Sequence, residues 1–193
     1  MRLRLFCLAL ILICATAAFA QGPVARDKAS VAISGKSITI EYGRPALKGR
    51  PFDSLMKQLP ADRIWRAGSD MVTWLTTELP LTIDSKKIPA GKYSLYVYCP
   101  EQGEYALVIN KDLGQPLSKV WAAAPPNQAN EPYPHFEYQK EIGNLEVARI
   151  PMKKAGLPPT DLFTIELKSS ASGAQMLMSW GDRSWTLDLV VTK

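Results

Sequence analysis

The chain has 193 residues, of which 47% are hydrophobic and 21% are charged, and its formal net charge is +5 at pH 7. This length and apolar content are enough for one domain with a buried core. Lysines and arginines do not gather in runs that could follow a phosphate backbone. The composition therefore argues against a nucleic-acid-binding protein.

Residues 1–20 have the features of a secretory signal peptide. Arg2 and Arg4 form a positive start, and residues 5–19 carry no charge. This apolar run of about 15 residues is shorter than the roughly 20 that a membrane-spanning helix needs. The small residues of Ala18–Ala20 fit the pattern after which signal peptidase cleaves. We therefore predict an exported protein, periplasmic or secreted, with no membrane association after cleavage.

Removal of this leader changes the cysteine and charge balance. Cys7 and Cys14 leave with it, and neither follows a small residue, which argues against a lipoprotein. Only Cys99 remains, so no internal disulfide can form, and an inert thiol is expected there. Without the two leader arginines, 21 basic residues face 18 acidic ones, a net charge of +3.

After a short lead-in at residues 21–30, alternation of apolar and polar residues dominates the chain. Such alternation over 4–8 residues is typical of a half-buried strand. In chain order it predicts strands near residues 31–33, 37–42, 72–76, 79–83, 93–97, 105–109, 145–150, 163–167, 176–180 and 185–191.

Two segments depart from this alternation. Residues 52–59 predict a short helix that ends before Pro60. Residues 111–138 hold five prolines, which lack the N–H that a ladder needs, and they predict a long loop. About nine or ten short strands within residues 31–193 predict a single all-β domain, an antiparallel β-sandwich, with a barrel as the alternative.

Motifs of the common catalytic families are absent. There is no G-x-S-x-G, H-E-x-x-H, P-loop or C-x-x-C motif. His135 is the only histidine, and we interpret it as a solvated loop residue rather than a triad member. Ser54 and Lys57 match S-x-x-K, but the partner motifs S-D-N and K-T-G are missing. With one histidine and one mature cysteine a zinc site lacks ligands, and no cofactor is indicated.

Four short motifs carry a family resemblance. They are Tyr-x-Arg-Pro followed by Lys-Gly-Arg in residues 42–50, Trp-Arg-x-Gly-Ser in 65–69, Pro-Ala-Gly-Lys-Tyr-Ser-Leu in 89–95, and Trp-Gly in 180–181. Together they resemble an exported bacterial family catalogued as domain of unknown function 2911 (DUF2911), over about residues 26–191. The resemblance implies a signal peptide and a β-rich fold, and it supplies no catalytic residue. The proline-rich stretch at 116–134 departs from the shorter connection expected in the family.

The same segments supply a candidate binding site. Its residues are Tyr42, Arg44, Arg50, Trp65, Arg66 and Asp70. Guanidinium groups suit carboxylate or phosphate, and the indole can stack on a sugar. If these side chains converge, they form a polar pocket with an aromatic floor. The competing interpretation is that the arginines brace loops through backbone carbonyls and the indole fills the core.

Three functions remain open at this stage. The favoured one is a non-enzymatic binding module for a small anionic or sugar-like ligand, with no metal or cofactor. An envelope carbohydrate or ester hydrolase is the alternative, and it needs two acids, or a serine and a base, in one cleft. A structural domain that docks on a partner through a sheet edge or an apolar patch is the third. The sequence leaves the ligand and the oligomeric state open.

Overall fold

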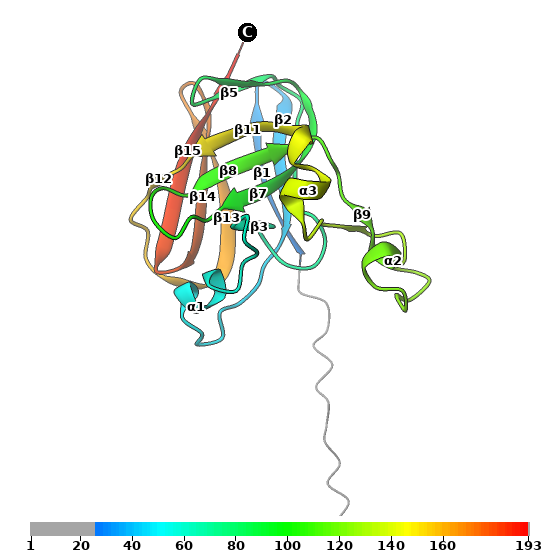
Figure 1. Cartoon of the computed structure of the whole chain (residues 1–193). Helices are drawn as coiled ribbons and strands as arrows, with labels where there is room; N and C mark the ends of the chain where they lie inside the picture. The colour runs from blue at the N-terminus through cyan, green and yellow to red at the C-terminus, as the bar shows by residue number, and fades with distance from the viewer. Residues whose placement is uncertain (1–25, 193) are drawn as a thin grey trace, which may run out of the picture.

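Two antiparallel sheets face each other in the computed structural model, which describes residues 26–192 (Figure 1). The expected signal peptide at residues 1–20 and the first part of the lead-in lie outside the described residues. The first strand already begins at Arg26, so residues 26–30 of the expected lead-in belong to the sheet. None of the helices in residues 26–192 is long and apolar enough to cross a membrane.

The first sheet contains seven strands. They are β1 (Arg26–Ile33), β2 (Lys36–Gly43), β3 (Ile64–Trp65), β4 (Trp74–Thr77), β7 (Gly91–Tyr98), β8 (Ala106–Asn110) and β11 (Glu146–Pro151). Their order is β1-β2-β4-β7-β8-β11, and β3 pairs with the last residues of β7. A two-residue turn at Ser34 and Gly35, both with positive φ, joins β1 to β2. Such a turn matches the twist of the strands that it joins.

The second sheet contains six strands. They are β5 (Leu81–Ile83), β6 (Lys86–Ile88), β12 (Lys153–Lys154), β13 (Thr160–Ser170), β14 (Gly173–Gly181) and β15 (Arg183–Val191). Their order is β13-β14-β15-β5-β6, and β12 pairs with β15. The strand total exceeds the nine or ten expected because several strands have only two or three residues and are too short to show an alternation.

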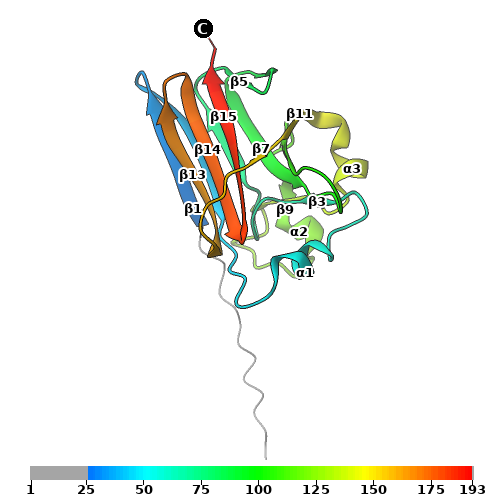
Figure 2. The ribbon, with the colours of Figure 1, turned by 90° about the vertical axis from the view of Figure 1, so that its left-hand side faces the viewer.

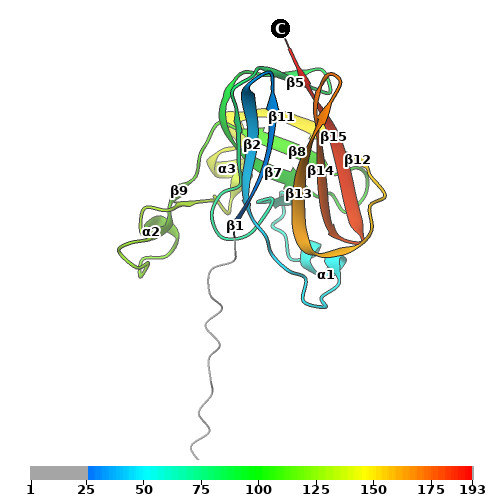
Figure 3. The ribbon, with the colours of Figure 1, turned by 180° about the vertical axis from the view of Figure 1, so that it is seen from behind.

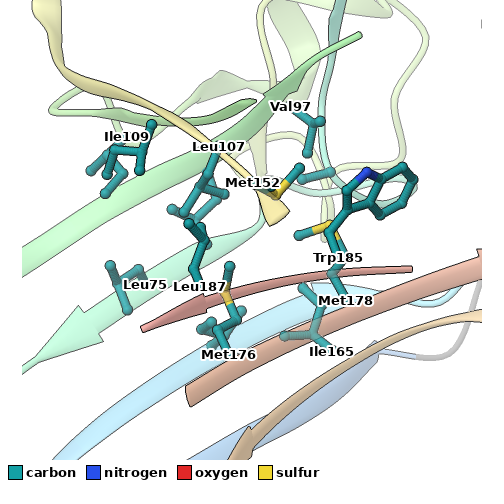
Figure 4. Close-up of a cluster of buried hydrophobic side chains, with 14 of the residues drawn as sticks. Leu75, Val97, Leu107, Ile109, Met152, Ile165, Met176, Met178, Trp185 and Leu187 are labelled. Atoms are coloured by element: carbon teal, nitrogen blue, oxygen red, sulfur yellow. The ribbon is translucent and has the colours of Figure 1, made fainter. Parts of the chain in front are cut away.

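The core lies between the sheets, where the apolar residues of both inner faces meet. Leu75, Val97, Leu107 and Ile109 of the first sheet face Ile165, Met176, Met178, Trp185 and Leu187 of the second (Figure 4). Burial of each such side chain stabilises the fold by roughly 1.5–3 kcal/mol. Residues 26–192 hold one cysteine, the buried and unpaired Cys99, so this clustering rather than a disulfide holds the described domain together.

The sheets do not close into a barrel. Strand β1 lies beside β13 at one side of the sandwich (Figure 2), but no ladder joins the two strands in the described part of the chain. Near this side, an isolated bridge joins Ala46, in the loop after β2, to Leu162 on β13. The sandwich prediction is therefore confirmed, and the barrel alternative is not.

Helix α1 (Phe52–Met56) is shorter than the expected helix at 52–59. Turns continue from its end toward Pro60, because a proline disfavours helical backbone in the residue before it. The buried side chains of Phe52 and Met56 attach α1 to one end of the sandwich. This end is the lower one in Figure 1, whereas the β5–β6 hairpin lies at the other end.

The proline-rich stretch between β8 and β11 contains more structure than the expected loop. It forms β9 (Gln115–Pro116), α2 (Leu117–Val120), β10 (Pro132–Tyr133), α3 (Tyr138–Glu141) and a 3-10 helix at Gly143–Leu145. The β9-to-β10 part, which we call the arm (residues 115–133), stands away from the sandwich (Figure 3). Helix α3 instead covers the outer face of the first sheet, where Tyr138 and Ile142 pack on Tyr96 and Val108.

Candidate functional site

Tyr42 lies at the end of β2 and bridges the two sheets. Its hydroxyl accepts a hydrogen bond from the amide of Ile165 at 2.9 Å and donates one to the carbonyl of the same residue at 3.2 Å. The ring meets Phe163 edge-on, with centroids 5.6 Å apart. Burial raises the pKa of Tyr42. The side chain therefore has a structural role inside the sandwich.

Arg44, two residues after Tyr42, also bridges the two sheets. Its Nε donates to the carbonyl of Phe163 at 3.2 Å, and its Nη2 donates to the hydroxyl of Thr164 at 3.0 Å. Its Nη1 forms an ion pair with Asp27 on β1 at 3.1 Å. The donors of the guanidinium thus bond to both sheets, as the competing interpretation of the arginines expects.

Trp65 and Arg50 also serve the fold. Trp65 is buried on β3, where it stacks on Trp180 with centroids 5.1 Å apart and an interplanar angle of 15°. Arg50 donates to the carbonyls of Leu47 at 2.8 Å and Ala46 at 3.0 Å, so it braces the loop that precedes α1. The indole fills the core and offers no accessible face to a ligand.

Arg66 and Asp70 lie in other surroundings. The Nη1 of Arg66 donates to the hydroxyl of Tyr133 at 3.1 Å, and its guanidinium lies 5.5 Å from the centre of that ring. Asp70 has a positive φ of 58° and acts electrostatically on Arg26. Tyr42, Arg44 and Trp65 therefore gather around Phe163 inside the sandwich. Arg50, Arg66 and Asp70 contact other neighbours, so the six residues expected to form one pocket do not all come together.

A large hollow instead lies at the α1 end of the sandwich. We call it the end cleft, and its volume is about 890 Å³. Its lining consists of Asp53, Met56, Lys57, Arg63, residues 100–105, residues 152–154, Arg183 and Trp185. These residues come from α1 and its C-terminal cap, the residue before β3, the β7–β8 turn, the β11–β12 junction and the start of β15. The volume falls within the range of small-molecule binding sites.

The floor of the end cleft is aromatic and apolar. Tyr105 stacks on Trp185 with centroids 5.1 Å apart and an interplanar angle of 16°. Met56 and Met152 are buried beside them. Burial raises the pKa of Tyr105 to about 12, so its hydroxyl is neutral at physiological pH and can donate a hydrogen bond. An aromatic ring with a polar edge suits the apolar face and the hydroxyls of a sugar.

The rim of the end cleft is charged, with more cations than anions. Its five cations are Lys57, Arg63, Lys153, Lys154 and Arg183, and its three anions are Asp53, Glu101 and Glu104. Within residues 26–192 the three lysines make no ion pair within 4.0 Å, so their charges are available to a ligand. The excess of positive charge favours an anionic ligand.

Two of the cations have defined positions. Arg63 has a positive φ of 58°, and its Nε donates to the carbonyl of Cys99 at 3.0 Å. The Nη2 of Arg183 reaches both carboxylate oxygens of Asp53, at 3.3 and 3.4 Å. Asp53 also lines a second, smaller hollow of about 280 Å³ between α1 and the β14–β15 turn. Arg50, one of the six sequence-predicted residues, contributes to this second hollow.

Other residues with possible chemistry lie away from the end cleft or are occupied. His135 contacts Asp112 at 3.2 Å and also Glu141, and its side chain is only 14% exposed, so it is less solvated than expected. The hydroxyl of Ser54 donates to the carbonyl of Pro51 at 2.7 Å and so stabilises the start of α1. No cluster of three or more metal-ligating residues occurs in the described part of the chain.

Sequence reasoning missed the end cleft because its residues come from five short segments that lie far apart in the sequence. The available signals were the adjacent Lys153 and Lys154 and the two glutamates of the 100–105 turn, and neither is distinctive alone. The pairing of β12 with β15 and backbone bonds such as that from Met152 to Tyr105 bring these segments to one place.

Comparison with known proteins leads to one family. No curated protein and no solved structure matches the chain. A family described as a protein of unknown function (DUF2911) matches residues 25–189, which include the whole end cleft and both sheets up to the last residues of β15. Because this match covers most of the chain, the protein belongs to the DUF2911 family.

Proposed function

We propose that this protein is an exported, soluble, non-enzymatic binding module that holds a small anionic or sugar-like ligand in the end cleft. The observation that carries the proposal is the combination of an aromatic floor with a rim in which five cations face three anions. The leader at residues 1–20 supports export. The binding position differs from the one expected from the sequence, whereas the ligand chemistry is the same.

The composition of the cleft favours binding over nucleophilic catalysis. Its described lining contains no serine, threonine, cysteine or histidine, which are the usual nucleophiles and bases of ester hydrolysis. Three carboxylates do line it, so a glycoside hydrolase is the second candidate. Release of reducing sugar from a bound oligosaccharide, abolished by Glu101→Gln or Glu104→Gln, would establish this candidate in place of a binding module.

The docking-domain alternative has one observation in its favour. Trp121, at the end of α2 in the arm, is 50% exposed, which is unusual for so large an apolar side chain. Trp185 is instead buried beneath the end cleft. A Trp121→Ser variant that loses a partner but keeps ligand binding would assign the two roles to different parts of the molecule.

A thermal-shift screen tests the proposed function. The panel contains neutral oligosaccharides, uronic acids, organic acids and peptidoglycan fragments, and we expect the anionic compounds to raise the melting temperature. The Lys153→Ala/Lys154→Ala variant should lose this shift. A Lys86→Ala/Lys87→Ala variant removes the same charge from exposed positions on β6, at the other end of the sandwich, and should keep it.

Two results contradict the proposal. The first is a panel in which no compound moves the melting temperature of the wild-type protein. The second is an equal loss of the shift in both double-lysine variants, because it would show that net charge rather than the end cleft attracts the ligand.

A further inference from the structure

The contact between Arg183 and Asp53 is a weak ion pair inside the end cleft. A single guanidinium nitrogen, Nη2, reaches both carboxylate oxygens, at 3.3 and 3.4 Å. The strong arrangement of these groups uses two nitrogens and shorter distances. The side chains are 44% and 68% exposed, so water competes for both partners. The Nε of Arg183 also lies 3.5 Å from a carboxylate oxygen of Asp182, which is likewise exposed. Both acids hold Arg183 loosely, and a better carboxylate can replace Asp53 at Nη2.

The position of Asp53 makes such a replacement relevant to the ligand. This side chain lines both the end cleft and the second hollow, so it forms part of the wall between them. A ligand that extends from one hollow toward the other passes the carboxylate and the guanidinium beside it. A neutral ligand leaves the pair intact, whereas an acidic ligand is repelled by Asp53 and attracted by Arg183.

The size of the end cleft indicates a ligand of more than one ring. Binding sites for drug-sized molecules measure roughly 300–1,000 Å³, and the end cleft is near the upper limit at about 890 Å³. The three rim lysines make no ion pair within residues 26–192, and they are separated along the rim, with Lys57 at the C-terminal cap of α1 and the other two on β12. Several negative groups on one ligand would therefore each find a cation.

We propose that the ligand is an acidic oligosaccharide, and that one of its carboxylates replaces Asp53 as the ion-pair partner of the Arg183 Nη2. This inference rests on the proposed function and adds the ligand class and a specificity determinant. Asp53 acts as an internal competitor: it occupies the guanidinium in the empty cleft and lowers the affinity for acidic ligands only. The unusual consequence is that removal of a charged cleft residue improves binding.

Isothermal titration calorimetry of the full mature chain tests this inference. The probes are trigalacturonic acid, the neutral trisaccharide maltotriose, monomeric galacturonic acid and citrate. We expect trigalacturonic acid to bind most tightly to the wild-type protein. Asp53→Asn should tighten its binding about two- to fivefold, which is the range that corresponds to loss of one exposed ion pair. Arg183→Gln should weaken it, and neither variant should change the affinity for maltotriose.

Asp84→Asn is the matched control. Asp84 is exposed in the β5–β6 turn, at the other end of the sandwich, and its positive φ of 43° is tolerated well by asparagine. The substitution changes the net charge as Asp53→Asn does, so a gain in both variants would assign the effect to long-range charge and overturn the inference. Circular dichroism of each variant verifies the fold.

The remaining outcomes separate the inference from the proposed function. Equal affinity for maltotriose and trigalacturonic acid, or no gain in Asp53→Asn, overturns the inference while the end cleft remains a binding site. Citrate that binds as tightly as trigalacturonic acid, with the same gain, overturns the oligosaccharide class in favour of free organic acids. Absence of binding by all four probes overturns the inference, and the thermal-shift panel then decides the proposed function separately.

Discussion

The hydroxyl of Tyr42 bonds to both backbone groups of Ile165, and so takes the place that a neighbouring strand would have along that edge of β13. Strand β13 pairs through a ladder only with β14, which leaves backbone groups on its other edge in need of partners. A buried amide or carbonyl without a partner is costly. One side chain from the first sheet satisfies two such groups in the second sheet.

Tyr42→Phe should destabilise the protein while the fold is retained. The substitution keeps the ring but leaves the amide and carbonyl of Ile165 without their partner, and we expect a loss of about 1–3 kcal/mol in the free energy of unfolding. Urea unfolding followed by tryptophan fluorescence measures this loss. Tyr98→Phe is the control, because no hydrogen bond of the Tyr98 hydroxyl is seen within residues 26–192. Similar losses in both variants would show that the bonds to Ile165 contribute little.

Arg44 and Arg183 should differ in what their removal affects. Arg44→Met deletes bonds to Phe163, Thr164 and Asp27. A hydrogen bond of a charged group contributes about 1.5–3 kcal/mol to the free energy of unfolding. We expect a clear fall in melting temperature with unchanged ligand affinity. Arg183→Gln should instead keep the melting temperature and weaken the binding of the acidic ligand. Lost binding in Arg44→Met at a temperature where it is folded would return the site to the position expected from the sequence.

Cys99 should be unreactive in the folded protein. Its side chain is buried, and burial raises the pKa of the thiol to about 12, so almost no thiolate exists at pH 8. Iodoacetamide at pH 8 should leave a native chain produced without residues 1–20 unmodified for hours and alkylate it within minutes in 6 M guanidinium chloride. Intact-mass spectrometry distinguishes the two. Rapid native labelling would mean that the β7 end opens far more readily than its burial suggests.

Stability should fall as the pH rises above 9. Burial raises the pKa of Cys99 from 9 to about 12 and that of Tyr105 from 10 to about 12. The unfolded chain therefore loses these protons first, and the folded state loses its advantage progressively between pH 9 and pH 12. Urea midpoints measured from pH 8 to pH 11.5 test this trend. In Tyr105→Phe the urea midpoint should decline less steeply with pH. A decline as steep as that of the wild-type protein would show that other groups control alkaline unfolding.

Most of the fold could be predicted from the sequence. The alternation at residues 185–191 places Trp185, Leu187 and Leu189 on one face, and the structure buries that face between the sheets. The arm could not be predicted in the same way. Its strands have two residues each and are held by backbone bonds such as that from Leu117 to Glu131, which leave no periodic pattern in the sequence.

The candidate site was harder to predict than the fold. The arginines and the tryptophan of the 42–70 region stand out in the sequence, but partners such as Phe163 and Ile165 lie more than 100 residues away from them. Arg44 meets Phe163 and Tyr42 meets Ile165, and nothing in the local sequence shows that these acceptors are backbone groups of an unpaired strand edge. The residue types show which groups each side chain can bind. Which group it does bind depends on the direction of the side chain, and that direction is known only from the tertiary fold.

Strand β15 runs from the end cleft to the opposite end of the sandwich, so its two ends lie in different surroundings. The strand begins with Arg183 in the end cleft and finishes at Val191 beside β5, at the other end of the sandwich (Figure 1). Nine residues of strand span roughly 30 Å. A biotin or surface tether attached after this strand would hold the molecule at the end of β15 that lies away from the end cleft, which is the orientation that biosensor or affinity-resin experiments require.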